Sequence, residues 1–219
     1  MIEKSGKAIL EEMKNIFSER QKEVTSRLGD FERAGKSEDE TIFAELVFCI
    51  LTPQSKAKNC WKAVERLKKK GLLWNGDAQS IADELSGVRF HNKKASYIIE
   101  ARRLFTGNTK SNIKSKVKSF ENNYKLRDWL VQNVEGIGYK EASHFLRNIG
   151  LGENLAILDR HILKNLHLAG IIDRIPNSLS PKIYFAIEKE MSKFAETINI
   201  PMAALDLVLW CKETGEIFK

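Results

Sequence analysis

The sequence is poor in cysteine, with only Cys49, Cys60 and Cys211 among its 219 residues. An odd number of cysteines at wide spacing argues against a disulfide framework, so we expect three buried, reduced thiols. The four histidines show no metal-ligand spacing with cysteines or carboxylates, and no glycine-rich nucleotide cradle is present. The sequence therefore predicts no bound metal and no organic cofactor.

Long apolar runs and strand-like patterns are also missing. No apolar run approaches ~18 residues, and the start of the chain lacks the hydrophobic region of a signal peptide. We therefore expect a soluble, cytoplasmic protein with no membrane partner. No segment alternates apolar and polar residues over a sustained length, and no repeat of about 20 to 50 residues occurs. These absences leave an all-α fold of roughly ten helices.

Basic residues outnumber acidic residues by 36 to 29, which gives a formal net charge of +7. This balance suits a nucleic-acid partner but does not require one, because many basic proteins bind nothing anionic specifically.

Capping signals and apolar spacing define the expected helices. Four residues are expected to cap helices: Asp77, Asn122, Asp159 and Ser180. Residues 30–37 are polar, contain a glycine and are interpreted as a connection, after which Ser37 would cap the next helix in a capping box with Glu40. Residues 108–118 carry four lysines and little periodicity, which makes them the most linker-like part of the chain.

A hairpin signal, Gly136-Ile137-Gly138, separates two apolar-periodic segments. Two glycines two residues apart allow a positive φ angle and a close backbone approach, so the chain can reverse between helices. The second helix begins with free N–H groups and its positive dipole end, which together favour an anion. Lys140 lies in its first turn, where the dipole disfavours a cation. Taken alone, the hairpin is most often a plain helix–helix turn, and Lys140 a surface lysine that touches phosphate.

Asp159 follows the apolar run Leu155–Leu158 and opens another helical pattern. A carboxylate is favoured there because it accepts hydrogen bonds from the first N–H groups of the helix. Capping and catalysis are compatible, and the residues alone leave the two roles about even.

Three stretches carry a resemblance to a known family. VEGIGYKEA, residues 134–142, resembles the helix-hairpin-helix of base-excision DNA glycosylases, and ILDRHI, residues 157–162, resembles the catalytic-aspartate segment that follows it. The terminal LWCKETGEIFK is similar to the end of the second, archaeal-type family of 8-oxoguanine DNA glycosylases, whose members end in a lysine. The lysine after the hairpin resembles that of members that are also abasic-site lyases.

The resemblance implies two helical modules with an active-site cleft between them. Residues 39–151 would form a six-helix module that ends in the helix-hairpin-helix, and residues 1–38 with 152–219 would form the second module. Lys140 would attack the sugar C1′ as an uncharged amine and form a Schiff base. Asp159 would stabilise the oxocarbenium-like charge and shuttle the lysine proton.

The resemblance also implies residues that recognise the lesion. The target base must leave the duplex, so Trp210 and Phe90 are candidates to stack on it, although Phe90 fits a core position equally well. Asp206, one helical turn before Trp210, is a candidate to accept a hydrogen bond from the base. Pro53 is a further candidate, on a loop. Lys219 would discriminate the lesion from guanine at its C8–N7 edge, or belongs to a solvated tail.

The implied DNA-binding residues lie on the hairpin and two other segments. The backbone N–H groups around Gly136 and Gly138 would bind phosphates without reading sequence. Gln54 would fill the gap left by the extruded base, or is a simple polar loop residue. His161 would touch phosphate, although an exposed or capping histidine is the more common interpretation.

These features predict a bifunctional, monomeric DNA repair glycosylase that excises 8-oxoguanine from double-stranded DNA and cleaves the abasic site by β-elimination. One alternative is the same scaffold acting on an oxidised pyrimidine or a mismatch. It is opposed by Lys219 and by the lack of the four closely spaced cysteines that hold an iron–sulfur cluster in some relatives. The other is a non-enzymatic helix-hairpin-helix DNA-binding protein, which would not need Lys140 together with Asp159.

Overall fold

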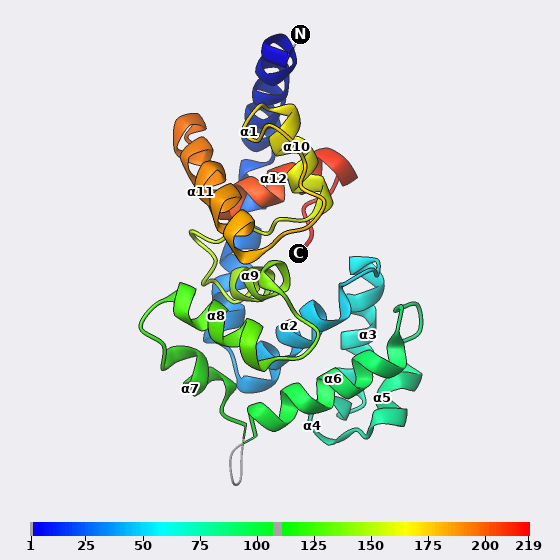
Figure 1. Ribbon diagram of the computed structural model, residues 1–219. Helices are drawn as coiled ribbons and strands as arrows, with labels where there is room; N and C mark the ends of the chain where they lie inside the picture. Colours follow the sequence, from blue (N-terminus) through cyan, green and yellow to red (C-terminus); the bar gives the residue numbers. More distant parts are fainter. Residues whose placement is uncertain (1, 107–110) are drawn as a thin grey trace. The chain divides into compact units, whose positions relative to one another are not determined.

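The structure, a computed structural model, describes residues 2–106 and 111–219, and within these ranges it contains twelve helices and no strand (Figure 1). The helices are α1 (Ile2–Lys36), α2 (Asp39–Leu51), α3 (Ala57–Lys69), α4 (Leu72–Asn75), α5 (Ala78–Glu84), α6 (His91–Leu104), α7 (Ile113–Lys118), α8 (Asn123–Asn133), α9 (Tyr139–Asn148), α10 (Arg160–Leu168), α11 (Pro181–Ile198) and α12 (Met202–Thr214). The predicted all-α class is confirmed. The two short helices α4 and α7 were not predicted.

The chain forms two compact units. The first combines the chain up to Glu32 with Gly152–Lys219, and so holds most of α1 together with α10, α11 and α12. The second consists of Arg33–Leu151 and holds α2 to α9. The assignment of residues 39–151, and of 1–38 with 152–219, as separate functional modules stays a prediction.

Helix α2 forms the centre of the second unit. Every residue from Ile42 to Leu51 is buried, and all of them except Glu45 are apolar, because this helix packs against α3, α6, α7 and α9. Aromatic packing extends this core to α4, where Trp74 stacks on Phe43 at a ring distance of 4.4 Å. Helix α9, which carries the predicted nucleophile, packs directly on this buried helix.

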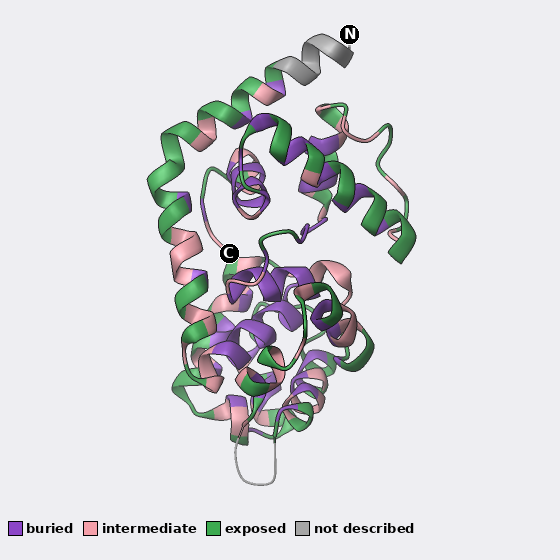
Figure 2. Cartoon of the chain, turned by 90° about the vertical axis from the view of Figure 1, so that its left-hand side faces the viewer, coloured by how far each residue is buried: buried purple, intermediate pink, exposed green. Residues whose placement is uncertain are grey.

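In the first unit, α12 packs against both α10 and α11, and its residues Ala204–Leu209 are buried. Within residues 8–36 of helix α1, where burial is described, only a few scattered residues are buried (Figure 2). No single described helix is long and apolar enough to cross a membrane; the pair α11 and α12, bent by 91°, meets that test only jointly and by length and composition.

All three cysteines are buried and unpaired with one another, which confirms the predicted reduced thiols. Burial raises the pKa of each thiol, to about 11 for Cys60 and well above its usual value for Cys49. The pKa of Cys211 is also raised by burial. The thiolate forms are therefore disfavoured at neutral pH.

The predicted connection at residues 30–37 is wrong, because α1 continues to Lys36. A Cβ atom at Gly35 would lie 2.0 Å from the Ile149 carbonyl oxygen, so this glycine permits close packing against the end of α9 and does not end the helix. The predicted capping box is also wrong. The N-cap of α2 is Glu38, and Ser37 Oγ instead donates to the Arg33 carbonyl oxygen at 2.7 Å.

The four predicted caps are confirmed, since the side chains of Asp77, Asn122, Asp159 and Ser180 all accept hydrogen bonds from backbone N–H groups of the following helix. The linker-like interpretation of 108–118 is wrong where the structure describes it, because α7 occupies Ile113–Lys118. Residues 108–110 of that segment lie outside the described residues.

Candidate active site

The predicted hairpin joins α8 to α9, and its two glycines serve different purposes. Gly136 has a φ angle of +83°, and a Cβ atom there would lie 2.3 Å from the ring of Tyr97 on α6. Both its conformation and its surroundings therefore require glycine. Gly138 is extended, with φ −113° and ψ −167°, and forms the N-cap of α9. Only the first glycine adopts the positive φ angle that the pattern suggested.

Lys140 is the second residue of α9, and its side chain is 26% exposed. Its Nζ atom lies 3.0 Å from Oε1 of Glu141. The other oxygen of Glu141 accepts a hydrogen bond from the Gly138 N–H at 3.1 Å. One carboxylate thus caps the helix and pairs with the predicted nucleophile.

Glu141 was not predicted as a site residue. Its signal was a glutamate three residues after the N-cap, which is the second half of a capping box. The first half of that pattern is normally Ser or Thr, and here it is Gly138, which has no side chain to cap. The pattern was therefore incomplete in the sequence.

Asp159 is positioned by the buried segment Leu155–Leu158, which two side chains of α11 hold by its backbone. Glu188 Oε2 accepts the Ala156 N–H at 2.7 Å, and the Tyr184 hydroxyl donates to the Ala156 carbonyl oxygen at 2.5 Å. Asp159 itself caps α10, because its Oδ1 atom accepts the N–H groups of the second and third residues of the helix at 2.8 Å each. Both cap bonds use the same carboxylate oxygen.

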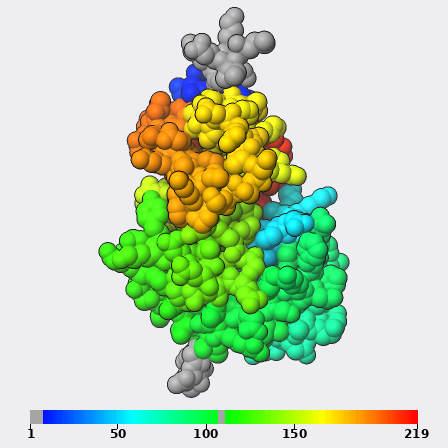
Figure 3. Space-filling view, viewed as in Figure 1, coloured from blue at the N-terminus to red at the C-terminus, as the bar shows by residue number. Residues whose placement is uncertain are grey.

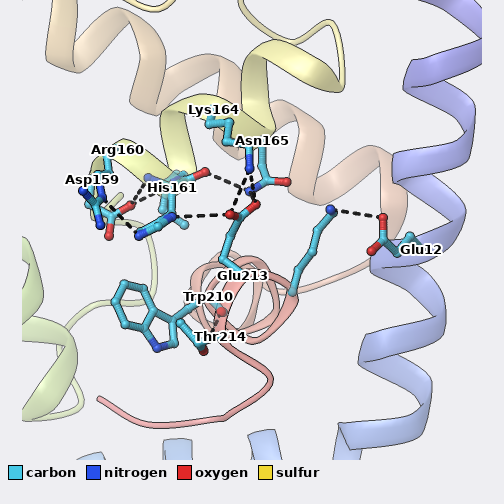
Figure 4. A network of polar contacts seen from close by, with 11 residues as sticks. Glu12, Asp159, Arg160, His161, Lys164, Asn165, Trp210, Glu213 and Thr214 are labelled. Atoms are coloured by element: carbon cyan, nitrogen blue, oxygen red, sulfur yellow. Dashed lines mark hydrogen bonds and ion pairs between the residues drawn. The ribbon is translucent and has the colours of Figure 1, made fainter. Parts of the chain in front are cut away.

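Helices α10 and α12 are joined by a polar network around Glu213 (Figure 4). The Glu213 carboxylate accepts hydrogen bonds from Lys164 at 3.0 and 3.1 Å and from Asn165 at 3.0 Å, and lies 3.5 Å from His161 Nδ1. These contacts, above all the hydrogen bonds from Lys164 and Asn165, lower the pKa of Glu213 to about 2. The ring of His161 meets Trp210 edge-on at 5.4 Å. The network thus brings together two predicted site residues.

The remaining candidates of the first unit lie on α12 and the tail that follows it. Asp206 is buried and Trp210 is half-buried. After α12 ends, Ile217 is buried again and Lys219 is half-buried. An apolar anchor close to the end of the chain keeps this tail packed, so Lys219 does not belong to a fully solvated end.

In the second unit, Phe90 is 54% exposed, so its alternative assignment to the core is wrong. Its φ angle is +59°, and the Arg89 guanidinium lies 5.4 Å from its ring centroid. Gln54 is exposed as well and has a φ angle of +57°, whereas Pro53 is half-buried. Figure 3 shows the segment between α2 and α3, in light blue, at the surface. Ser55 links the two turns, because its Oγ accepts the Arg89 N–H at 3.0 Å.

Residues 24–200 match the protein family described as 8-oxoguanine DNA glycosylase. The chain belongs to this family. An 8-oxoguanine DNA glycosylase/AP lyase of Fusobacterium nucleatum is 44% identical over 209 residues, which cover 95% of this chain and 96% of that protein. A protein of the same description from Methanocaldococcus jannaschii is 39% identical over 210 residues, or 96% of this chain and 97% of the relative.

Two solved structures of 8-oxoguanine DNA glycosylases share this fold. The crystal structure of the Thermotoga maritima protein has a TM-score of 0.87 and 35% identity. The match covers 98% of this chain and 100% of that chain. The Methanocaldococcus jannaschii glycosylase/lyase, crystallised with a 15mer DNA containing 8-oxoguanine, has a TM-score of 0.88 and 35% identity, covering 97% of this chain and 100% of that chain. The predicted family and helix-hairpin-helix fold are confirmed.

In this member of the 8-oxoguanine DNA glycosylase family, the predicted site residues fall into two sets. The second unit carries Pro53, Gln54, Phe90, Gly136, Gly138 and Lys140, and the first unit carries Asp159, His161, Asp206, Trp210 and Lys219. The individual roles of these residues stay predictions.

Proposed function

We propose that this protein excises 8-oxoguanine from double-stranded DNA and then cleaves the strand at the abasic site. The observation that carries the proposal is the amine of Lys140 in the first turn of α9, directly after the hairpin, in a chain 44% identical to a glycosylase/AP lyase. We further propose that it acts in the cytoplasm as a monomer.

Lys140 serves as the nucleophile. Its neutral amine attacks C1′ of the damaged nucleotide, and the N-glycosidic bond breaks with its electron pair leaving on the base, which takes up a proton. The attached nitrogen loses one proton, and its lone pair then forms the C1′=N bond as the C1′–O4′ bond breaks and O4′ takes up a proton, which gives a protonated Schiff base. Removal of a proton from C2′ then expels the 3′ phosphate, which is β-elimination, and water releases the enzyme. Glu141 Oε1, 3.0 Å from Nζ, holds the lysine side chain in place at the start of α9.

Asp159 stabilises the positive charge that develops on the sugar as the base departs, and accepts the proton of the lysine. Its Oδ1 atom is fixed by two N–H groups at the start of α10. This cap holds the carboxylate in one orientation, so that its other oxygen can serve the reaction. Preorganisation of this kind makes an electrostatic contribution effective, because no reorientation is needed during bond cleavage.

Recognition of the lesion uses the exposed and half-buried aromatic residues. Trp210 and Phe90 stack on the extruded base, Gln54 fills the gap in the duplex, and Lys219 reads the C8–N7 edge. Asp206 accepts a hydrogen bond from the base, and Pro53 is a further lesion-recognition residue.

Phosphate binding falls to the hairpin and to His161. The Gly138 N–H already donates to Glu141, so we assign the phosphate to neighbouring N–H groups of the hairpin and the first turn of α9. Gly136 shapes the turn that presents them.

The test is incubation with a duplex that carries a single 8-oxoguanine, with and without borohydride. We expect base release, strand cleavage and a covalent protein–DNA adduct from the wild type, and none of the last two from Lys140→Gln, which keeps length and polarity but has no amine. Parallel duplexes with an oxidised pyrimidine or a mismatch test the rival substrates. An adduct formed equally well by Lys140→Gln would remove Lys140 from its role. DNA binding without base release would leave only a binding module.

A further inference from the structure

Lys94, on α6, is a buried lysine in the second unit, with only 4% of its surface exposed. Its ammonium group donates three hydrogen bonds: to the Leu51 carbonyl oxygen at 2.7 Å, to the Pro53 carbonyl oxygen at 2.7 Å and to Ser55 Oγ at 3.1 Å. These are all the donors that an ammonium possesses. None of the three partners is a carboxylate, so all three hydrogen bonds are made to neutral oxygen atoms. Burial accordingly lowers the pKa of Lys94.

Burying a lysine is costly, and an apolar side chain would fill the same space without that cost. We attribute the retention of this buried ammonium to the segments that its three hydrogen bonds hold in place. The three hydrogen bonds of Lys94 connect the first turn of α6 to the end of α2 and to the turn that follows α2. Lys94 therefore acts as a clamp on the turn Pro53–Ser55.

This turn and its neighbour both contain a residue in a conformation that its side chain disfavours. Gln54 has a φ angle of +57° and Phe90 one of +59°. Such angles are sterically disfavoured for a residue other than glycine, asparagine or aspartate. Asn199, the third described non-glycine residue with a positive φ angle, belongs to the tolerant type and ends α11. The two unusual residues are thus the two on the clamped turns.

One oxygen atom connects the clamp to both turns. Ser55 Oγ accepts the Lys94 ammonium at 3.1 Å and the Arg89 backbone N–H at 3.0 Å. Arg89 directly precedes Phe90. Movement of the Lys94 ammonium would therefore release the backbone on both sides, at Gln54 and at Phe90.

We propose that Lys94 is a positioning residue for base extrusion, which holds Gln54 and Phe90 in the backbone conformations needed to fill the duplex gap and to stack on the extruded base. The proposal rests on the function proposed above. It assigns Lys94 no contact with DNA, because its ammonium is enclosed by its three partners.

The decisive experiment compares two substrates for Lys94→Met, which is unbranched like lysine but one atom shorter and removes all three donors. We expect single-turnover excision of 8-oxoguanine to fall about tenfold or more, since each lost tenfold corresponds to about 1.4 kcal/mol of transition-state stabilisation. Strand cleavage at a preformed abasic site should stay within about twofold, because no base has to be extruded or stacked there. Parallel loss of both activities would overturn the proposal.

A second comparison separates positioning from general stability. In a chain that already carries Gln54→Ala and Phe90→Ala, adding Lys94→Met should change excision less than about twofold, because the residues through which it acts are gone. An undiminished effect in that background would contradict the proposed route. Lys93→Met is the matched control, since Lys93 lies beside Lys94 and contacts the ring of Tyr97 at 5.6 Å outside the clamp. Its ratio of excision to abasic-site cleavage should equal that of the wild type.

Ser55→Ala provides the same test if Lys94→Met does not fold. It removes the oxygen shared by the two turns but leaves the ammonium its two carbonyl partners. We expect the same selective loss of excision, smaller in size, with a melting temperature close to that of the wild type. Full excision activity in Ser55→Ala would overturn the proposal. A wild-type protein that does not excise 8-oxoguanine would instead refute the proposed function.

Discussion

Lys140 Nζ and Glu141 Oε1 lie 3.0 Å apart in the first turn of α9, so the proposed nucleophile is held in place by the carboxylate beside it. The same carboxylate caps the helix through the Gly138 N–H. The two contacts can be separated, because a glutamine still accepts the cap hydrogen bond but carries no charge.

For Glu141→Gln we expect single-turnover strand cleavage to fall, because the charge that holds Lys140 Nζ beside the start of α9 is lost. Its folding stability should stay close to that of the wild type, because the amide oxygen can still accept the Gly138 N–H. Glu141→Ala should show the same fall in cleavage and also lose about 1 kcal/mol of folding stability with the cap. Single-turnover cleavage and urea unfolding measure the two effects. Equal cleavage rates for Glu141→Gln and the wild type would show that the ion pair does not position the amine.

Asp159→Asn should lower base excision by about 100-fold or more while it changes stability by less than about 1 kcal/mol. An asparagine oxygen can still accept the two N–H groups that now bind Oδ1, but the negative charge is lost. Single-turnover kinetics and thermal unfolding separate the two outcomes. Near-normal turnover would mean that Asp159 is only a helix cap.

Deletion of Lys219 should reduce the preference for 8-oxoguanine over guanine about tenfold, which corresponds to about 1.4 kcal/mol, the scale of one good polar contact. The buried Ile217 keeps the tail anchored, so the melting temperature should change by only about 2 °C. Lys219→Met removes only the ammonium, so its comparison with the deletion tells whether that ammonium discriminates. Unchanged preference after deletion would assign the discrimination to other residues.

Glu213 makes an acid-sensitive contribution to stability. Its pKa is about 2 in the folded protein, against an ordinary value of 4.5, so its stabilisation is complete above pH 4.5 and is lost as the pH falls toward 2. Glu213→Gln should therefore be less stable than the wild type at pH 7, by about 1 to 2 kcal/mol once the 52% exposure of the Lys164 side chain is considered. The difference should shrink between pH 4.5 and 3. Thermal unfolding of both proteins across this range checks it, and a constant difference would exclude Glu213 as its source.

Local signals in the sequence predicted what depends on local contacts. Asp159 caps α10 through N–H groups two and three residues away, and Ser180 with the proline after it starts α11 in the same way. These interactions are complete within one turn of helix, so the pattern of residue types is sufficient to find them.

Most of the errors and omissions arose where the partner lies far along the chain; Ser37 and Glu141, whose partners lie within four residues, are exceptions. Gly35 resembled a helix end, but its role depends on the backbone of Ile149. The hydrogen bond from Lys94 to the Leu51 carbonyl oxygen joins α6 to α2. The hydrogen bond from Lys164 to Glu213 joins α10 to α12. For Phe90 the sequence left core and surface equally open, because an aromatic between basic residues suits either position. The positive φ angle of Phe90 and the exposure of its side chain place it at the surface.

The burial of all three cysteines has a consequence for the conditions in which such an enzyme is needed. 8-Oxoguanine accumulates when oxidants are abundant, and the same oxidants attack cysteine through its thiolate. In this protein the pKa of Cys60 is about 11, and burial raises the pKa values of Cys49 and Cys211 as well. The thiols thus remain protonated and shielded from peroxide. The oxidants that create 8-oxoguanine should therefore not inactivate this protein through its cysteines.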